Sequence, residues 1–317
     1  MNVSEPFQNH HLAVMSIFKR FALLPRTLRL KVFSWTHDEQ KTRVRYIGEG
    51  ESLDYLRNTV FKDHHFERKA TIAPWQLKRY CRYDGITIIE INRFLKGLCR
   101  SQWITYPWIR QKVELGGEHY RARRRSIEDN YGRKARKYGY TFTCSREPEQ
   151  VDIFYENYYL PYIYWRYGNL SHVRTKACLQ NLLQQGKGLL FKVETSGVWV
   201  AAIFCVRNAA QLTILALGMA GDFKRHLHRG ALSAGYYLLD KWAQENDFTV
   251  LDLLRSRPFV NDGVYNHKKK WGAQPCRDPW PHTCWTLLLP EDCAVPKALH
   301  PLLIWRHRRF LTLNELL

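Results

Sequence analysis

Acidic residues are scarce in this sequence relative to basic ones. Its 317 residues include 29 aspartates and glutamates against 49 lysines and arginines, so the formal net charge is +20. Such an excess favours a polyanionic partner: a nucleic acid, an anionic membrane surface or a phosphorylated ligand. The alternative is a basic surface that only keeps the protein in solution, because net charge carries no specificity.

Three further absences narrow the class of protein. No apolar run approaches the ~18 residues of a membrane span, and basic residues interrupt the apolar patches of the first 30 residues, unlike those of a secretory signal. None of the 8 cysteines forms a CxxC pair, and no neighbouring histidines complete a zinc pattern. We therefore expect a cytoplasmic protein with reduced thiols, no metal and at most peripheral contact with the inner face of a membrane.

Two segments alternate apolar and basic residues, 17–33 and 299–310. Either could lie on anionic lipid as an amphipathic helix, and we expect a basic amphipathic helix over 294–317. Packing against the body of the protein is the alternative, since both apolar stripes are short. Residues 1–12 are polar and are expected to form a disordered tail.

The composition supports a large core in two domains, because 45% of the residues are hydrophobic and 14% are aromatic. Periodicity predicts an α/β first domain over 13–117, with strands at 42–47, 86–91 and 108–115 and a helix at 52–61. Gly116-Gly117 ends it. A basic helical connector is expected over 118–137, either as a solvated surface or as a strip that contacts phosphates.

The second domain is expected over 138–293. Strands are predicted at 139–144, 189–194, 199–206, 212–219, 248–253 and 283–289, a polar loop at 221–229, and helices at 147–167 (interrupted at Pro161), 171–185 (capped by Ser171) and 230–246. The central strands form an antiparallel meander, and the last helix makes a right-handed crossover to a parallel strand.

A ligand should bind where the two parallel strands splay, at the N-terminus of the crossover helix. The residues there are Met219, Arg229, Gly230 and Ala231. Glycine lets a phosphate approach the backbone, and the helix amides point at it. An ordinary helix start with a glycine near its cap is the alternative.

The segment 251–273, LDLLRSRPFVNDGVYNHKKKWGA, places clustered cations after an apolar strand, as a site for an anion requires. Arg255 and Lys268 are candidates for contacts with a donor phosphate or a developing oxyanion. Ser256 could donate to the oxyanion, Tyr265 could protonate the leaving group, and His267 could be the base, as could His226 or His228.

Each candidate also has a structural interpretation. Arg255 could pair with Asp252 or Asp262, Ser256 could be a turn residue, and Tyr265 could be a buried aromatic. Lys269 and Lys270 are expected to be solvated surface cations.

The chain resembles the GNAT-type acyltransferases found among Fem-like and cellulose-synthesis-associated proteins. Those proteins show Asp-Phe-Gly-Arg-Ser, a glycine turn and then Phe-Lys-x-x-Trp/Phe-Gly; this chain has DLLRS at 252–256, DG at 262–263 and HKKKWG at 267–272. Leu254 stands in place of the glycine and His267 in place of the aromatic. The resemblance implies two tandem GNAT-like domains of α/β (α+β) class with mixed, mostly antiparallel sheets.

The same resemblance implies a function. It points to an acyltransferase with acyl-CoA as co-substrate, acting on an amine or hydroxyl of a cell-envelope or polysaccharide precursor. The phosphate arm Arg/Gln-x-x-Gly-x-Gly/Ala of ordinary GNAT enzymes is replaced by Leu227, Gly230 and Leu232. A Fem-like aminoacyl transferase that uses charged tRNA therefore stays open, as does a catalytically silent module that binds nucleic acid or an anionic membrane.

Overall fold

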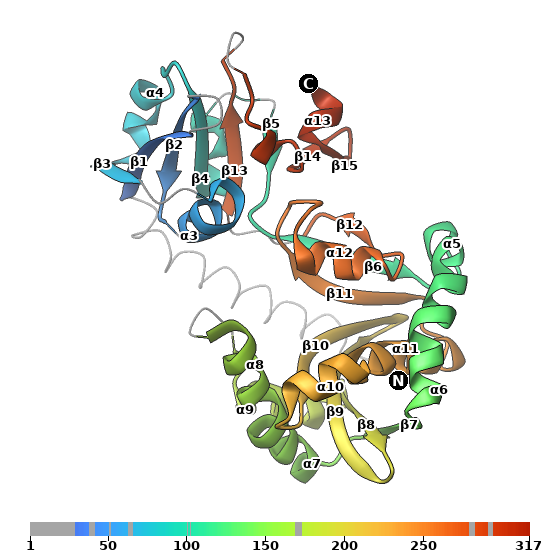
Figure 1. Ribbon diagram of the computed structural model, residues 1–317. Helices are drawn as coiled ribbons and strands as arrows, with labels where there is room; N and C mark the ends of the chain where they lie inside the picture. Colours follow the sequence, from blue (N-terminus) through green and yellow to red (C-terminus); the bar gives the residue numbers. More distant parts are fainter. Residues whose placement is uncertain are drawn as a thin grey trace, which may run out of the picture. The chain divides into compact units, whose positions relative to one another are not determined.

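The computed structural model describes residues 29–37, 42–50, 52–62, 66–99, 101, 103–168, 173–278, 283–290 and 294–317. They form two compact units, each built around its own mixed sheet (Figure 1). Most neighbouring strands in both sheets are antiparallel, so the expected mixed α/β class is confirmed. The expectations for the 1–12 tail, for most of 17–33 and for the Ser171 cap lie outside the described residues.

The first unit contains a six-stranded sheet of order β3-β1-β2-β4-β13-β5, in which only the β2–β4 pair is parallel. Every residue of β4 is buried, as its run of isoleucines predicts. The strands are β1 (Leu30–His37), β2 (Thr42–Gly48), β3 (Glu67–Ile72), β4 (Ile86–Asn92), β5 (Trp103–Thr105) and β13 (Thr283–Leu288). The short helices are α3 (Leu53–Tyr55), η1 (Leu56–Phe61), η2 (Pro74–Gln76), α4 (Leu77–Tyr80), η3 (Arg93–Leu98) and η7 (Lys297–Leu299).

The expected amphipathic helix over 294–317 is wrong. The segment forms a hairpin of β14 (Leu303–Arg306) and β15 (Arg309–Thr312), followed by the short helix α13 (Leu313–Leu316). His307 and Arg308 have φ values of 49° and 62°, and these left-handed turn residues reverse the chain. Leu303 and Ile304 are buried, so the apolar residues of the 299–310 segment pack into this unit.

The described end of the 17–33 segment is also a strand. β1 begins at Leu30, and its two-residue alternation of buried Leu30 and Val32 with exposed Lys31 is typical of a half-buried strand.

The second unit contains a seven-stranded sheet of order β12-β6-β11-β10-β9-β8-β7. The predicted meander of β8, β9 and β10 is antiparallel, and β10 pairs with β11 in parallel after the crossover helix α11. The strands are β6 (Ile109–Glu114), β7 (Tyr140–Ser145), β8 (Gly188–Thr195), β9 (Val198–Asn208), β10 (Gln211–Met219), β11 (Val250–Ser256) and β12 (Gln274–Cys276).

Helices cover both faces of this sheet (Figure 1). Alternate residues point to opposite faces, so Leu189 and Phe191 pack in one core with α11, while Leu190 packs in another with α7 and α9. The helices are α5 (Glu118–Ile127), η4 (Glu128–Gly132), α6 (Arg133–Lys137), α7 (Pro148–Ile153), η5 (Phe154–Tyr159), α8 (Leu160–Tyr167), α9 (Lys176–Gln184), α10 (Phe223–Arg229), α11 (Ala231–Glu245) and α12 (Gly263–Lys269).

The boundaries of the two compact units differ from the expected domain ranges 13–117 and 138–293. β6, expected in the first domain, lies in the second sheet, and β13, expected in the second domain, pairs with β4 and β5. The first unit runs to Ile109 and includes Arg257–Asp262 and Arg277–Leu317; the second comprises Arg110–Ser256 and Gly263–Cys276.

Three local predictions need correction. The loop expected over 221–229 is helix α10, capped by Asp222, whose carboxylate accepts the Arg225 N–H at 3.3 Å. The α9 helix begins after Thr175, whose hydroxyl accepts the Cys178 N–H at 3.2 Å. The helical path from 148 to 167 does not stop at Pro161, because proline is tolerated in the first turn of α8. No described helix is both long and apolar enough to cross a membrane.

Candidate active site

The parallel strands β10 and β11 part soon after they meet. Their pairing runs only from Gln211 opposite Val250 to Thr213 opposite Asp252, although β10 continues to Met219 and β11 to Ser256. An irregularity in the β9–β10 register between Ile214 and Ala216 marks the same point. The sequence predicted that these strands would splay, and the pairing confirms it. Beyond Thr213 no described residue of β10 pairs with β11.

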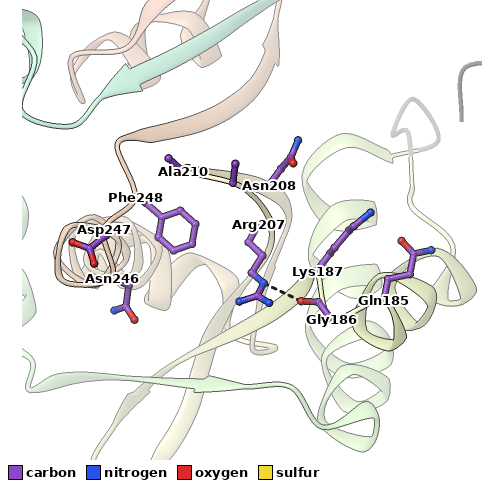
Figure 2. Close-up of a pocket in the computed structure, with 10 residues that line it drawn as sticks. Gln185, Gly186, Lys187, Arg207, Asn208, Ala210, Asn246, Asp247 and Phe248 are labelled. Carbon is purple, nitrogen blue, oxygen red and sulfur yellow. Dashed lines mark hydrogen bonds between the residues drawn. The ribbon is translucent and has the colours of Figure 1, made fainter. Parts of the chain in front are cut away.

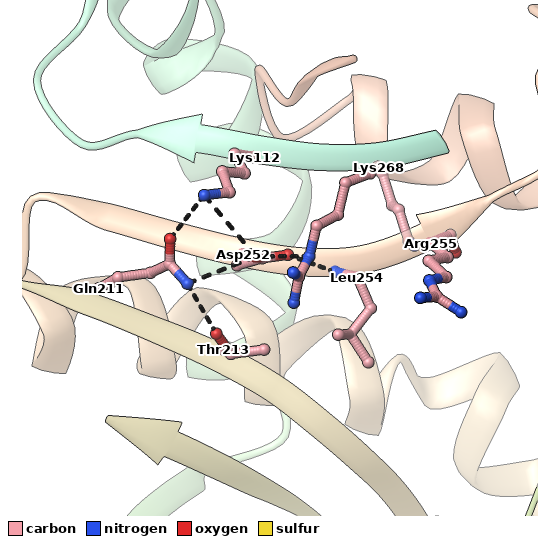
Figure 3. A network of polar contacts seen from close by, with 8 residues as sticks. Lys112, Gln211, Thr213, Asp252, Leu254, Arg255 and Lys268 are labelled. Carbon is pink, nitrogen blue, oxygen red and sulfur yellow. Dashed lines mark hydrogen bonds and ion pairs between the residues drawn. The ribbon is translucent and has the colours of Figure 1, made fainter. Parts of the chain in front are cut away.

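The buried carboxylate of Asp252 lies at the last paired residue of β11 and bonds to polar side chains of the flanking strands (Figure 3). Asp252 is fully buried, and its Oδ2 lies 2.8 Å from Arg110 Nε and 4.0 Å from Lys112 Nζ. Gln211 Nε2 donates to the same oxygen at 3.4 Å and to Thr213 Oγ1 at 3.0 Å. Arg110 and Lys112 of β6 and Gln211 of β10, the strands on either side of β11, thus face the buried Asp252 charge. Such partners offset the cost of removing a carboxylate from water.

The other Asp252 oxygen, Oδ1, accepts the backbone N–H of Leu254 at 2.9 Å. Leu254 has φ +61°, the left-handed region that glycine adopts at little cost and leucine rarely adopts. Leu254 stands where the GNAT-like pattern has glycine, so the structure supplies a conformational reason for glycine there. The left-handed residue turns β11 away from the regular strand path directly beyond the last pair with β10.

Three of the predicted catalytic residues hold β11 and α12 together. Lys268 is buried, and its Nζ donates to the Arg255 carbonyl at 2.7 Å. The buried Ser256 hydroxyl bonds to Gln111 Oε1, and Gln111 Nε2 donates to the Tyr265 carbonyl at 3.2 Å. These contacts give the Lys268 and Ser256 side chains a structural role. Tyr265 takes part in them through its backbone carbonyl, and burial raises the pKa of its phenol.

Arg255 and His267 are placed differently. The Arg255 side chain is exposed, while Asp252, one of its expected partners, pairs with Arg110. Burial, followed by the charges of Arg166 and Lys268, lowers the pKa of His267 to about 4. The Tyr236 ring packs edge-on against this imidazole, with ring centroids 5.5 Å apart. His267 is therefore neutral at pH 7.

The crossover helix α11 begins beside a group of cations. Gly230 has φ +77° and separates α10 from α11, and a Cβ at this position would lie 2.9 Å from Lys134 Cδ. The Arg229 guanidinium lies 5.8 Å from the centroid of the Tyr138 ring, and the Lys137 ammonium lies 5.4 Å from the same centroid. An anion at this helix end would meet both the helix amides and these side chains.

Two of the predicted donor-binding residues, Met219 and Ala231, are fully buried, so in this structure neither is exposed to a ligand. Arg229 and Gly230 keep their predicted position at the helix start.

The basic segment 118–137 is packed, not merely solvated. The Tyr120 hydroxyl donates to Asp240 of α11 at 2.6 Å, and the Tyr237 hydroxyl donates to Glu128 at 2.7 Å. Burial raises the pKa of Asp240 to about 6. α5 also carries the exposed residues Arg121, Arg123, Arg124 and Arg125, of which Arg124 donates to Gln244 of α11 at 3.3 Å.

Sequence reasoning missed several residues of this region. Arg110 and Lys112 alternate in IRQKVE, so their common strand face was readable, although their partner Asp252 was not. Arg166, which influences His267, carried no local signal in the sequence, whereas Lys134, which covers Gly230, belongs to the basic segment 118–137 that was considered as a phosphate-contacting strip.

A hollow of about 660 Å³ lies at the other end of the sheet (Figure 2). It is lined by the β9–β10 turn, the end of α9 and the α11–β11 turn, including Lys187, Asn208 and Asp247. Arg207 Nε donates to the Gly186 carbonyl at 3.0 Å within it. Because it lies where β10 and β11 begin and not where they part, we do not assign the reaction to it. Among the described residues no group of three or more His, Cys, Asp or Glu could hold a metal ion.

No family model matches the sequence, and no curated protein matches it. Solved structures similar to the chain include L-PGS from Bacillus licheniformis, with 14% identity, a TM-score of 0.40 and coverage of 80% of this chain and 79% of that one. FemX has 13% identity and a TM-score of 0.42, over 81% of this chain and 84% of that one. A GCN5-related N-acetyltransferase from Kribbella flavida has 11% identity and a TM-score of 0.32, over 81% and 55%. Because these values are low, the architecture is assigned from the chain's own strand order.

Proposed function

We propose that the second unit is a GNAT-type acyltransferase that moves an acyl group from a phosphate-bearing donor to an amine or hydroxyl. The observation that carries the proposal is the parting of β10 and β11 beyond Thr213 and Asp252, at the end of β10 from which the chain leads into α11. Parted strands leave backbone N–H and C=O groups without ladder partners, and such groups can receive an extended donor.

The donor would be held by its phosphates at the start of α11. The Lys134 side chain packs against the buried Gly230, and Lys134, Lys137 and Arg229 supply positive charge around Tyr138 at this helix end. Acyl-CoA is the donor we favour, as a co-substrate and not as a bound prosthetic group. The acceptor would be a cell-envelope or polysaccharide precursor, as the resemblance to Fem-like and cellulose-synthesis-associated proteins implies.

In the reaction, the acceptor nitrogen or oxygen attacks the donor carbonyl and a tetrahedral oxyanion forms. Backbone N–H groups that face the gap between the strands are suited to stabilise that oxyanion. Collapse breaks the bond to the donor sulfur or oxygen, which leaves with the proton lost by the acceptor. A pKa of about 4 makes His267 a weak base at neutral pH. We therefore assign it to orienting the acceptor, with water carrying the proton.

A second candidate is aminoacyl transfer from charged tRNA. The specific observation in its favour is the group of four exposed arginines on α5, which belongs to the same helical segment as Lys134. Such a group of cations could contact a phosphate backbone beyond the donor's reactive end. Donor identity therefore separates the two candidates.

In the test, the purified protein is incubated with labelled acyl-CoA or with labelled aminoacyl-tRNA, at low and at high salt. Any product is identified by mass spectrometry. Replacing Lys134 and Arg229 by glutamine should raise the KM for the true donor about ten-fold or more, since each removes a charge-assisted contact. Lys187→Gln, at the hollow on the other end of the sheet, is the matched control. Salt-dependent binding of polyanions without turnover of either donor would refute an enzymatic function and favour a binding module.

A further inference from the structure

Two aromatic side chains of the first unit are unusually exposed. Trp75 is 72% exposed and Phe94 is 66% exposed. Trp75 lies in η2 and Phe94 in η3, two 3-10 turns that pack against each other. Single exposed apolar residues are ordinary, but here two large exposed aromatics stand on turns that contact each other. We call these two residues the Trp75–Phe94 patch.

Both turns hold their aromatic residue on a fixed backbone. Pro74 is buried at the start of η2, Gln76 Oε1 accepts the Ala73 N–H at 2.8 Å, and the buried Leu77 anchors the following helix. In η3, Asn92 Oδ1 accepts the Phe94 N–H at 3.0 Å. The two aromatics are therefore exposed on capped turns, so little backbone conformational freedom would be lost on binding.

The turns that carry the patch, and the residues next to them in the chain, are rich in cations. The stretches 74–82 and 93–99 contain five basic residues and no acidic residue. Four of them are exposed: Lys78, Arg79, Arg82 and Lys96. The fifth, Arg93, lies over the Phe94 ring at 5.2 Å. The nearest acid along the chain, Asp84, is paired with Arg43 at 3.2 Å.

We propose that the Trp75–Phe94 patch docks the protein on an anionic membrane surface. The rings would enter the boundary between headgroups and acyl chains, where tryptophan is favoured, and the surrounding cations would contact lipid phosphates. Single-stranded nucleic acid also attracts aromatics and cations, but its binding uses a groove that tracks the backbone. Two capped turns that each expose an aromatic ring match a lipid interface better. The docking is independent of the proposed transferase activity.

The test is co-sedimentation of the full chain with phosphatidylcholine vesicles with and without phosphatidylglycerol, at low and high salt. We expect binding only to the anionic vesicles, weakened by salt. Trp75→Ser with Phe94→Ser should weaken binding about ten-fold or more, because the buried apolar area is lost. Lys78→Gln with Arg79→Gln should weaken it about 25-fold, at roughly five-fold for each cation near the surface.

Matched controls come from the second unit. Trp165→Ser removes another exposed aromatic, and Arg123→Gln with Arg125→Gln removes two exposed cations from α5. The swap Trp75→Phe with Phe94→Trp should retain binding and a wild-type melting temperature. Docking at this patch is wrong if the controls weaken binding as much as the patch variants. It is also wrong if the serine pair leaves binding unchanged, or if an oligonucleotide binds and the vesicles do not.

Discussion

Leu254 offers the sharpest test of the site geometry. Its φ of +61° is a left-handed conformation in the middle of a strand, and it is held by the Asp252 carboxylate at 2.9 Å. A non-glycine residue in this conformation costs about 1–2 kcal/mol. Glycine in an ordinary strand position instead costs about 0.5–1 kcal/mol relative to alanine.

The informative comparison is Leu254→Ala against Leu254→Gly. Both variants remove the leucine side chain beyond Cβ, so the loss of its half-buried surface is nearly common to the two. Only the alanine variant keeps the Cβ that makes the left-handed conformation costly. The left-handed cost to alanine, less the ordinary strand penalty of glycine, makes the Leu254→Gly variant more stable than Leu254→Ala by about 1 kcal/mol. That difference is about 2–4 °C in melting temperature for a domain of roughly 150–250 residues.

Thermal unfolding followed by near-UV circular dichroism measures the difference. Arg255 is the control position, because it is the next residue of β11, is exposed and has no positive φ. At Arg255 the order should reverse, with alanine more stable than glycine by about 0.5–1 kcal/mol. A Leu254→Gly variant that melts at or below Leu254→Ala would refute the left-handed conformation and, with it, the proposed distortion of β11 beyond its last pair with β10.

Three other predictions concern buried charge. Asp252→Asn should lower the free energy of unfolding by about 2–3 kcal/mol, because Arg110 and Lys112 lose their carboxylate while the Leu254 N–H keeps an acceptor; an unchanged urea midpoint would contradict it. Burial raises the pKa of Asp240 in the folded protein to about 6. The folded state therefore binds the Asp240 proton more tightly than the unfolded state, and the free energy of unfolding is highest below the unfolded pKa and falls as pH rises through 6. Asp240→Asn should therefore raise the melting temperature by several degrees at pH 8 and little at pH 4, at about 1.4 kcal/mol for each pKa unit; an equal effect at both pH values would contradict the raised pKa. The His267 ring should titrate near pH 4 in an NMR titration, with His228 as the exposed comparison, and a midpoint near the ordinary ~6.5 would show that the imidazole is not desolvated.

The elements that could be read from the sequence are those with a strong local signal. The strand at 86–91 is a run of apolar β-branched residues, and the meander strands are long and bounded by turns such as Ser196-Gly197. The short strands β5, β12 and β14, with three or four residues each, were missed because such segments hold too few residues to show a period. Their position is decided by partners far away in the chain.

The site was harder to predict than the fold, because its contacts are long-range. Asp252 is paired with Arg110 and Ser256 with Gln111, more than a hundred residues earlier in the chain. Lys268 was expected to contact a donor phosphate or an oxyanion, yet its ammonium is buried against the Arg255 carbonyl. Nothing about a leucine predicts a left-handed conformation, so the position of Leu254 needed the structure.

The placement of β6 has a consequence for how the second unit can fold by itself. A fragment of 138–293, the range that the sequence suggested, would lack β6, α5 and α6. Asp252 would then be buried without Arg110 and Lys112, and Asp240 would lose Tyr120. An uncompensated buried charge costs about 3–5 kcal/mol, a large share of the 5–15 kcal/mol that stabilises a typical domain.

A fragment of 110–276 keeps all these partners and every strand of the seven-stranded sheet except the first residue of β6. We expect 110–276 to show a cooperative thermal transition and dispersed NMR signals, and 138–293 to show neither. The added strand β13 cannot rescue the shorter fragment, because its partners β4 and β5 belong to the other sheet. A cooperative transition in 138–293 would mean that β6 is dispensable and that the Asp252 network does not stabilise the gap between β10 and β11.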